Sequence, residues 1–190
     1  MAEPLRSEIV SDDAELLILV DSQDQALGHL DKASCHDGSG ILHRAFSLFI
    51  FNSQGQLLLQ QRAANKRLWG GYWSNSCCSH PRKAETMQQA VSRRCEQELG
   101  FSTPMQFVYK FEYQAEYADK GSEHELCSVF IGQFDGTPNV NATEVSAYRW
   151  VDPAQLNREL GDPDSQFTPW LRLEWQTLND DYLSLMPKIL

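Results

Sequence analysis

The sequence lacks an apolar run long enough to cross a membrane. Its longest purely aliphatic stretch is LLILV at residues 16–20, whereas a transmembrane helix needs about 20 apolar residues. The first 13 residues, MAEPLRSEIVSDD, also lack the basic region and apolar segment of a secretory signal. These absences predict a cytoplasmic protein with no membrane partner.

Positive charge is scarce as well. The 190 residues contain 16 basic and 26 acidic side chains, a net charge of −10, which disfavours nucleic acid as the main partner. The basic side chains are nevertheless concentrated, because residues 62–94 hold seven of them and only one acidic residue, Glu85. We expect this basic segment to bind a small anion, the alternative being an ordinary solvated surface.

Cysteines are few and do not suggest disulfides. There are five of them, two are adjacent, and no export signal accompanies them, so we expect reduced thiols. Repeats and low-complexity segments are absent, and the length fits one ordinary domain. We therefore expect a single domain over residues 14–190, preceded by a flexible tail of residues 1–13.

The pattern of apolar residues predicts a mixed α/β domain. Strands are expected at 14–21, 43–52, 56–62, 107–117, 123–134 and 148–151, with helices at 86–99, 153–160 and 169–185. The second and third strands are separated by SQG and should form a hairpin. Asp152 and Thr168 each precede a proline and should cap the last two helices.

Two adjacent thiols beside an imidazole occur in NSCCSHP, residues 75–81. Gly70, Gly71 and Pro81 in the surrounding sequence predict a loop for this segment. Either Cys77 or Cys78 could face a ligand, and the sequence alone leaves both possibilities open.

Histidines and glutamates suggest a second type of site. Glu123 and Glu125 lie two residues apart on a predicted strand, so both side chains should point to one face. A divalent cation would relieve their repulsion, and imidazole with carboxylate suits zinc, manganese or iron better than calcium. The candidate ligands are His36, His43, His80, Glu123 and Glu125. The alternative is that they are unrelated surface residues.

The segment SHPRKAETMQQAVSRRCEQELGF, residues 79–101, resembles the Nudix box of the Nudix superfamily. The residues that fit the pattern are Glu85, Arg93, Cys95, Glu98, Gly100 and Phe101. Ser79, Arg94 and Gln97 depart from it, and two metal-binding carboxylates are thereby replaced by an arginine and an amide. The resemblance implies a Nudix scaffold that has lost the usual diphosphate hydrolysis.

Several motifs in order, namely HRAFSLFIFN, LLLQQR, NSCCSHP, RRCEQELG and EHE, resemble the type I isopentenyl-diphosphate isomerases over residues 15–178. The resemblance implies an α/β fold, a Nudix-like α/β/α sandwich with a mixed sheet. It also implies a five-carbon diphosphate as the small-molecule substrate, whose double bond is moved by protonation and deprotonation. It leaves open whether the protein is a monomer or a homodimer.

The same resemblance implies a role for particular residues. Cys78 and Glu125 would exchange the acid and base roles across the substrate, Tyr113 would assist the glutamate, and the Trp170 ring would stabilise a cation. Cys77 would then be a packed neighbour. The diphosphate contacts would be Lys32, Arg62, Lys66 and Arg94.

Two metal ions are implied as well. A Mn²⁺ or Zn²⁺ ion would bind His36, His43, His80, Glu123 and Glu125. Mg²⁺ would bridge the diphosphate to Glu98 and to the backbone of Cys78.

Two rival functions follow from the same residues. One is a Nudix diphosphohydrolase acting on a nucleotide, which the changes at Arg94 and Gln97 disfavour. The other is a non-catalytic, metal-dependent binding domain that keeps the fold. Release of phosphate would favour the first rival, and binding without turnover would favour the second.

Overall fold

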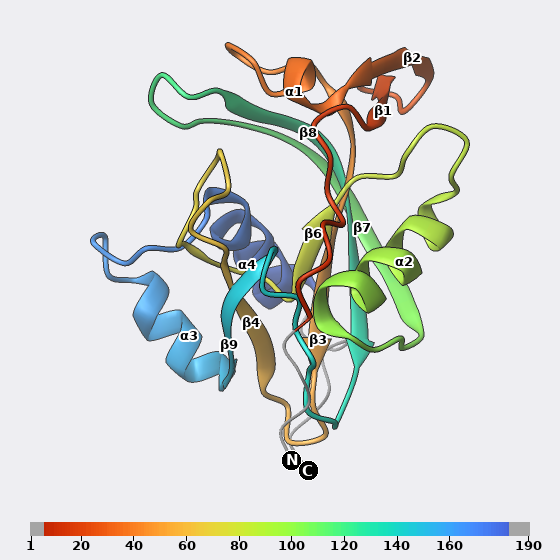
Figure 1. Cartoon of the computed structure of the whole chain (residues 1–190). Coiled ribbons are helices and arrows are strands. Elements are labelled where there is room, and N and C mark those ends of the chain that lie inside the picture. The colour runs from red at the N-terminus through yellow and green to blue at the C-terminus, as the bar shows by residue number, and fades with distance from the viewer. Residues whose placement is uncertain (1–5, 183–190) are drawn as a thin grey trace.

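One mixed sheet with helices on both faces forms the domain in the computed structural model, which describes residues 6–182 (Figure 1). The strands are β1 (Leu16–Val20), β2 (Ala26–Asp31), β3 (His43–Phe51), β4 (Leu57–Arg62), β5 (Trp73–Ser74), β6 (Cys77–Ser79), β7 (Met105–Glu116), β8 (Ser122–Gln133) and β9 (Val145–Val151). The helices are α1 (Lys32–Cys35), α2 (Met87–Leu99), α3 (Pro153–Leu160) and α4 (Pro169–Asp181). The predicted α/β/α sandwich is confirmed.

Strand β3 is the centre of the sheet. It pairs in parallel with β8 along its whole length and antiparallel with β6 on its other side. Its odd-numbered residues Phe49 and Phe51 pack under α3 and α4, whereas Phe46, Leu48 and Ile50 pack under α2. A strand covered on both faces has few polar positions, which explains the nearly continuous apolar run AFSLFIF.

The predicted hairpin is only partly correct. A tight turn does join β3 and β4, with the Asn52 amide donating to the Gln56 carbonyl at 2.9 Å. Beyond that turn the two strands pair only at Phe51 and Leu57. They then separate, because β4 pairs with β9 and β3 pairs with β6 and β8.

The cysteine segment was predicted to be a loop, and this was wrong. Cys77–Ser79 forms the short strand β6, in which Cys78 lies opposite Ser47 and Cys77 opposite Leu48. The approach to β6 is fixed by side chains, since the Ser76 hydroxyl donates to the Leu58 carbonyl at 2.7 Å and the Asn75 amide donates to the Cys77 carbonyl at 3.0 Å. Both hydrogen bonds are buried, so the segment is held rigidly.

Helix α2 begins and ends as predicted. The Thr86 hydroxyl and the Gln89 side chain form a capping box at its start. Gly100 ends the helix with a φ of 78°, and a Cβ atom there would lie 2.5 Å from the Asn139 carbonyl oxygen. Glycine is therefore required at this position both for its backbone conformation and for the close approach.

Helices α3 and α4 begin at Pro153 and Pro169 as predicted, but the expected side-chain caps are absent. Neither Asp152 nor Thr168 accepts a capping hydrogen bond through its side chain. Thr168 instead shares a hydrogen bond with the Ser74 hydroxyl. Helix α4 ends at Asp181, short of the predicted residue 185, and the last part of that prediction lies outside the described residues.

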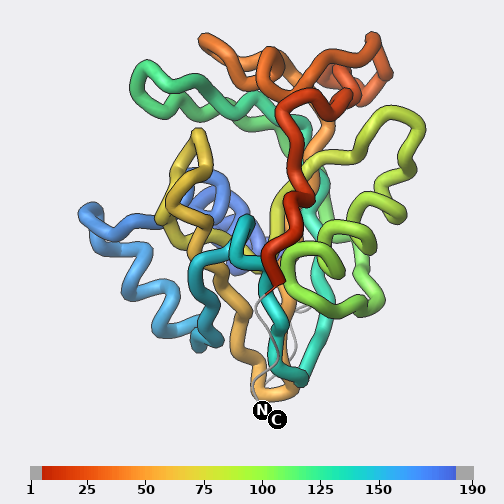
Figure 2. The backbone as a smooth tube through the Cα atoms, in the orientation of Figure 1, coloured from red at the N-terminus to blue at the C-terminus, as the bar shows by residue number. Residues whose placement is uncertain are grey.

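Residues 6–13 run along the domain between α2 and the segment that leads into β9 (Figure 2). The Glu8 carbonyl accepts hydrogen bonds from Asn141 and Thr143. The Val10 carbonyl accepts from Arg82 and Arg94. Residues 1–5 lie outside the described part, and the flexible tail and the domain boundary at residue 14 stay predictions.

Candidate active site

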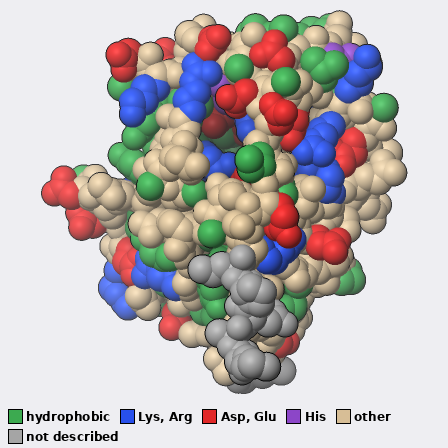
Figure 3. Space-filling model, in the orientation of Figure 1, with side chains coloured by type: hydrophobic (Ala, Val, Ile, Leu, Met, Phe, Trp, Pro, Cys, Tyr) green, Lys and Arg blue, Asp and Glu red, His purple; other side chains and the backbone are tan. Residues whose placement is uncertain are grey.

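One cavity of about 510 Å³ collects nearly every residue that the sequence singled out. In the space-filling view, basic and acidic side chains gather around a hollow in the upper part of the visible face (Figure 3). Predicted site residues that line the cavity are Lys32, His36, Arg62, Lys66, Cys78, His80, Arg94, Glu98, Tyr113, Glu123, Glu125 and Trp170. His43 is the exception, because it is fully buried behind the cavity.

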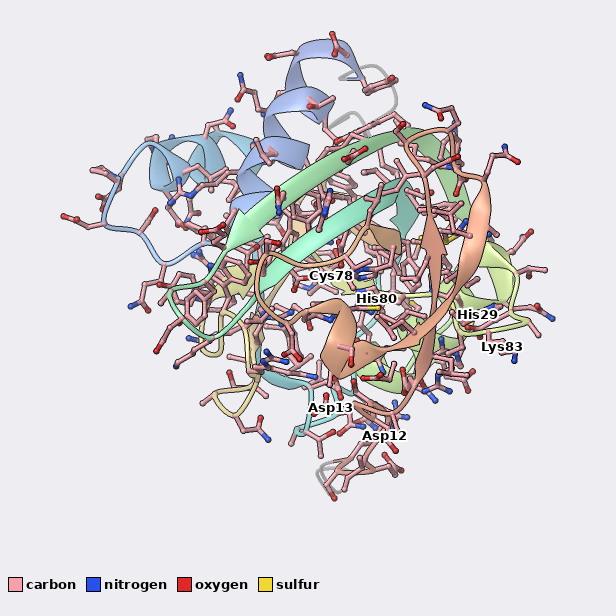
Figure 4. The ribbon with its side chains drawn as sticks, turned by 90° about the horizontal axis from the view of Figure 1, so that it is seen from above. Asp12, Asp13, His29, Cys78, His80 and Lys83 are labelled. Carbon is pink, nitrogen blue, oxygen red and sulfur yellow. The ribbon has the colours of Figure 1, made fainter. Side chains whose placement is uncertain are left out.

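The three predicted histidine ligands and the two predicted glutamate ligands form one group, in which His43 is buried and the other four line the cavity. One ligand atom from each of the five residues lies within 4.8 Å of the others. Glu123 and Glu125 do project from the same face of β8, as the spacing predicted. In the view from above, His80 and Cys78 lie near the centre of the molecule, whereas His29 lies at its edge (Figure 4).

The hydrogen bonds of the histidines suit a metal ion. Nδ1–H of His36 donates to the Lys32 carbonyl and Nδ1–H of His43 donates to the Ile41 carbonyl, each at 2.7 Å. When the ring is neutral, such a bond leaves Nε2 unprotonated and directs it at the centre of the group. His43 Nε2 is fully buried without a hydrogen-bond partner, and the buried Glu123 Oε2 has, among the described residues, a single ion-pair contact, with His36 Nε2 at 2.9 Å. A divalent cation would satisfy both atoms, so these residues fit a metal.

Electrostatics within this group follow from burial. Burial and the neighbouring His80 lower the pKa of His43 to about 3, so this ring is neutral as a ligand must be. Burial disfavours the charged form of His36, but Glu123 outweighs it and raises the pKa of His36 to about 9. Burial and Glu123 raise the pKa of Glu125 to about 7. Glu123 therefore favours a positive charge on His36, while Glu125 keeps a proton more readily than an ordinary glutamate.

The adjacent cysteines are separated by the alternation of β6. Cys77 is fully buried in the apolar cluster beneath α2, whereas Cys78 faces the cavity. The predicted placement of Cys77 as a packed neighbour is confirmed. Burial raises the pKa of the Cys78 thiol to about 12, with Glu98 and Glu125 adding to it and Arg62 opposing it. Cys78 is therefore a neutral thiol.

Glu125 is held from two sides. Its Oε1 lies 2.8 Å from Nε2 of His80, and its Oε2 accepts a 2.7 Å hydrogen bond from the Tyr113 hydroxyl. Tyr113 lies directly opposite Glu125 in the β7–β8 pairing. Burial and Glu125 raise the pKa of Tyr113 well above its usual value, so the phenol stays protonated and acts as the donor.

Trp170 is fixed at the wall of the cavity by its indole nitrogen. Nε1–H donates to the Ser74 hydroxyl at 2.9 Å and to Asn75 Oδ1 at 3.2 Å. The Arg62 guanidinium lies over the ring, 5.3 Å from its centroid. The ring therefore already has a cation at one face, which shows that a positive charge fits there.

Five cationic side chains line the cavity: the four predicted diphosphate contacts Lys32, Arg62, Lys66 and Arg94, together with Arg67. Lys66 and Arg94 share Glu144, whereas Arg62 lies beside Trp170 and Cys78. Burial and the nearby positive charge of Lys66 both lower the pKa of Lys32. Arg94 is 4% exposed, and its guanidinium donates to the Val10 carbonyl at 2.9 Å. Crowded and largely desolvated cations of this kind favour a multivalent anion.

Comparison with known proteins decides the family. The NUDIX domain model matches residues 41–171. An Isopentenyl-diphosphate Delta-isomerase 1 of Photorhabdus laumondii is 44% identical over 85% of this chain and 93% of its own length. An isopentenyl-diphosphate Delta-isomerase of Burkholderia multivorans is 46% identical over 82% of this chain and 88% of its own length. The chain belongs to the isopentenyl-diphosphate Delta-isomerase family.

Solved structures support the fold of this isomerase-family chain. DR0079 from Deinococcus radiodurans superposes with a TM-score of 0.71 at 20% identity, over 85% of this chain and 98% of that protein. A MutT protein from Methanosarcina mazei gives a TM-score of 0.61 at 18% identity, over 73% of this chain and 93% of that protein. At such identities the likeness concerns the fold alone.

Two glutamates of this isomerase-family chain were missed by the sequence reasoning. Glu144 precedes β9 and binds two of the cavity cations, and nothing in its local sequence marks it. Glu174 is fully buried on α4, one turn after Trp170. Its spacing from Leu171, Trp175 and Leu178 puts it on the apolar face of the helix, a signal that could have found it.

Glu174 has few polar partners for a buried carboxyl group. The Cys127 thiol donates to Oε1 at 3.5 Å, and Oε2 has no hydrogen-bond partner. Burial raises the pKa of Glu174 to about 8, against smaller opposing effects of Ser47 and Cys127. The group is therefore a neutral acid near pH 7, and its ionisation would place an uncompensated charge in the core.

Replacing Glu174 by glutamine should flatten the pH dependence of stability. The unfolded chain releases this proton near the ordinary pKa of 4.5, whereas the folded chain keeps it up to about 8. The free energy of unfolding of the unchanged protein should therefore fall relative to that of Glu174→Gln as pH rises through this interval, by up to about 1.4 kcal/mol per pH unit. Urea unfolding at several pH values measures the difference, and parallel profiles would contradict it.

Proposed function

We propose that this chain interconverts isopentenyl and dimethylallyl diphosphate, in the biosynthesis of isoprenoid precursors. The observation that carries the proposal is one cavity that is lined both by a pair of groups able to exchange protons and by several cations. A thiol and a metal-site carboxyl group project into it from β6 and β8, which flank β3 on opposite sides. Lys32, Arg62, Lys66 and Arg94 line the same cavity, and Lys66 and Arg94 lie together at Glu144. A short hydrocarbon with a diphosphate tail needs both kinds of group.

The reaction needs one group that gives a proton and another that takes one. Protonation of the terminal alkene carbon creates a tertiary carbocation, and removal of a proton from the carbon on the other side gives the product. Cys78 and Glu125 would fill these two roles, and which one is the acid depends on the direction of the reaction. Tyr113 would orient Glu125 and share its negative charge through their hydrogen bond.

The carbocation must be protected from water and stabilised for its short life. Trp170 is 2% exposed and Tyr113 is 7% exposed, so aromatic surface closes this part of the cavity. The Trp170 indole is held in place by Ser74 and Asn75. Its π face would stabilise the positive charge, an interaction that strengthens when water is excluded.

Metal ions fit this scheme at two places. His36, His43, His80, Glu123 and Glu125 would hold Mn²⁺ or Zn²⁺, which would lower the proton affinity of Glu125 and fix its orientation. Glu98 and the backbone of Cys78 would hold the Mg²⁺ that accompanies the diphosphate. Hydrolysis as the main activity is disfavoured by Arg94, which stands at a carboxylate position of the Nudix box.

Incubation with isopentenyl diphosphate in deuterated water tests this function. We expect formation of dimethylallyl diphosphate with deuterium at its new methyl group, because the added proton comes from an exchangeable acid. Mass spectrometry and proton NMR measure both the product and the label. Phosphate release without isomerised product would favour hydrolysis instead, and tight binding without any product would favour a binding domain.

A further inference from the structure

Each of the four predicted diphosphate contacts already donates a hydrogen bond to an oxygen atom of the chain. Lys32 donates to the Ser11 hydroxyl and Arg62 donates to the Leu68 carbonyl. Lys66 donates to Glu144, while Arg94 donates to Glu98 and, at 3.0 Å, to Glu144 Oε2. A diphosphate that binds these cations must share them with these oxygens or displace them.

Glu144 differs from the other oxygen donors in charge and in the number of cations it contacts. Its Oε2 atom contacts both Lys66 and Arg94, whereas Glu98 contacts Arg94 within the same helix and has no ion pair with Lys66 among the described residues. Burial favours the neutral form of Glu144, but Arg94 and Lys66 outweigh it and hold its pKa below the usual value. Glu144 therefore carries a full negative charge inside an anion site.

The backbone holds Glu144 in this position. Its carbonyl accepts a 2.9 Å hydrogen bond from the Ala63 amide, and its own amide donates to the Asn141 carbonyl at 3.0 Å. The side chain is 5% exposed, so water screens its charge poorly. Lys66, by contrast, has a flexible four-carbon stem and can exchange one anionic partner for another.

We propose that Glu144 is an internal competitor of the diphosphate group. Its carboxylate and the diphosphate bind the same Lys66 ammonium and the same Arg94 guanidinium, so Glu144 weakens diphosphate binding and speeds product release. The proposal rests on the proposed function, because it needs a diphosphate at Lys66 and Arg94. This role explains why the buried, negatively charged Glu144 lies among cations that would bind an anion.

The direction in which one substitution changes the affinity for pyrophosphate tests this proposal. Glu144→Gln removes the charge and keeps the volume of the side chain, so inorganic pyrophosphate with saturating Mg²⁺ should bind about tenfold more tightly. Most of that change should appear as slower dissociation. Isothermal titration calorimetry gives the affinity, and the KM for isopentenyl diphosphate should fall in parallel. A residue that merely held the two cations in place would have the opposite effect, weaker binding and a higher KM.

A matched control is available outside the cavity. Glu159 also binds an arginine, Arg149, and Glu159→Gln should leave pyrophosphate affinity unchanged. If Glu144→Gln fails to fold in a thermal melt, Glu144→Asp replaces it. That variant retracts the carboxylate by one methylene group, and about threefold tighter binding is expected.

The outcomes separate the two proposals. Unchanged or weaker pyrophosphate binding in the Glu144 variants, with normal binding by the unchanged protein, would overturn the role of Glu144 alone. Failure of the unchanged protein to bind pyrophosphate at all would instead contradict the diphosphate site, and with it the proposed function.

Discussion

Replacing Cys78 by serine is expected to reduce turnover of isopentenyl diphosphate by about a thousandfold or more. Positioned acid and base groups typically contribute factors of about 10² to 10⁴ to a rate. A serine hydroxyl is a much weaker acid than a thiol, and its alkoxide is not accessible as a base. Dimethylallyl product measured at saturating substrate gives kcat directly. Because serine is nearly the same size, KM should change little.

Cys77 provides the matched control for this experiment. Cys77→Ser makes the same replacement of sulfur by oxygen at the neighbouring position. That side chain, however, lies in the apolar cluster beneath α2. A hydroxyl group buried there without a partner costs about 1–3 kcal/mol of stability. We therefore expect a lower midpoint of thermal unfolding and nearly normal turnover at temperatures well below it. Equal losses of turnover in the two variants would contradict the proposal that Cys78, and not Cys77, exchanges the proton with the substrate.

Glu125→Gln should stop isomerisation and leave diphosphate binding nearly intact. The amide cannot exchange a proton with carbon, and it is a poorer metal ligand than a carboxylate. The proposed diphosphate contacts Lys66 and Arg94 pair with Glu144 and not with Glu125, so pyrophosphate affinity should stay within about threefold of the unchanged protein. Turnover and calorimetric binding, measured on the same preparation, separate the two effects.

Metal content must be measured alongside, because Glu125 is also a candidate ligand. Elemental analysis after dialysis shows whether the variant still binds a metal ion. Glu112→Gln is a suitable control, since Glu112 pairs with His124 on the outer side of the β7–β8 hairpin. A normal isomerisation rate in Glu125→Gln would exclude Glu125 as the partner of Cys78.

Local sequence predicted the elements of this fold better than their pairing. The apolar residues of β3 and the caps and spacing of α2 depend on short-range preferences that a single segment displays. The partners of β3 could not be predicted from local sequence, because the paired residues of β6 and β8 are 29 to 33 and 82 residues away, respectively. Their register depends on the assembled core. The strand at Cys77–Ser79 was missed for the same reason, since its flanking glycines and proline are typical of a loop.

The site residues likewise differ in whether local sequence could predict them. Those that belong to recognisable motifs, such as Cys78 and the Glu123–Glu125 pair, were predicted, and the structure brings them into one cavity. Glu144 was not predicted, because only the folded chain brings it next to Lys66 and Arg94. A lone glutamate before a strand looks like any solvated residue, and its significance depends entirely on its neighbours in space.

The central position of β3 ties the assembly of the cavity to the folding of the core. A slip of β3 by one residue against β8 would turn His43 and Ser47 towards α2 and bring Phe46 and Leu48 to the cavity side. Such a slip would displace the candidate metal ligand His43 and expose apolar side chains in the same step. Folding intermediates in which the core is misaligned should therefore be inactive, so active protein and correctly packed protein should appear at the same rate during refolding.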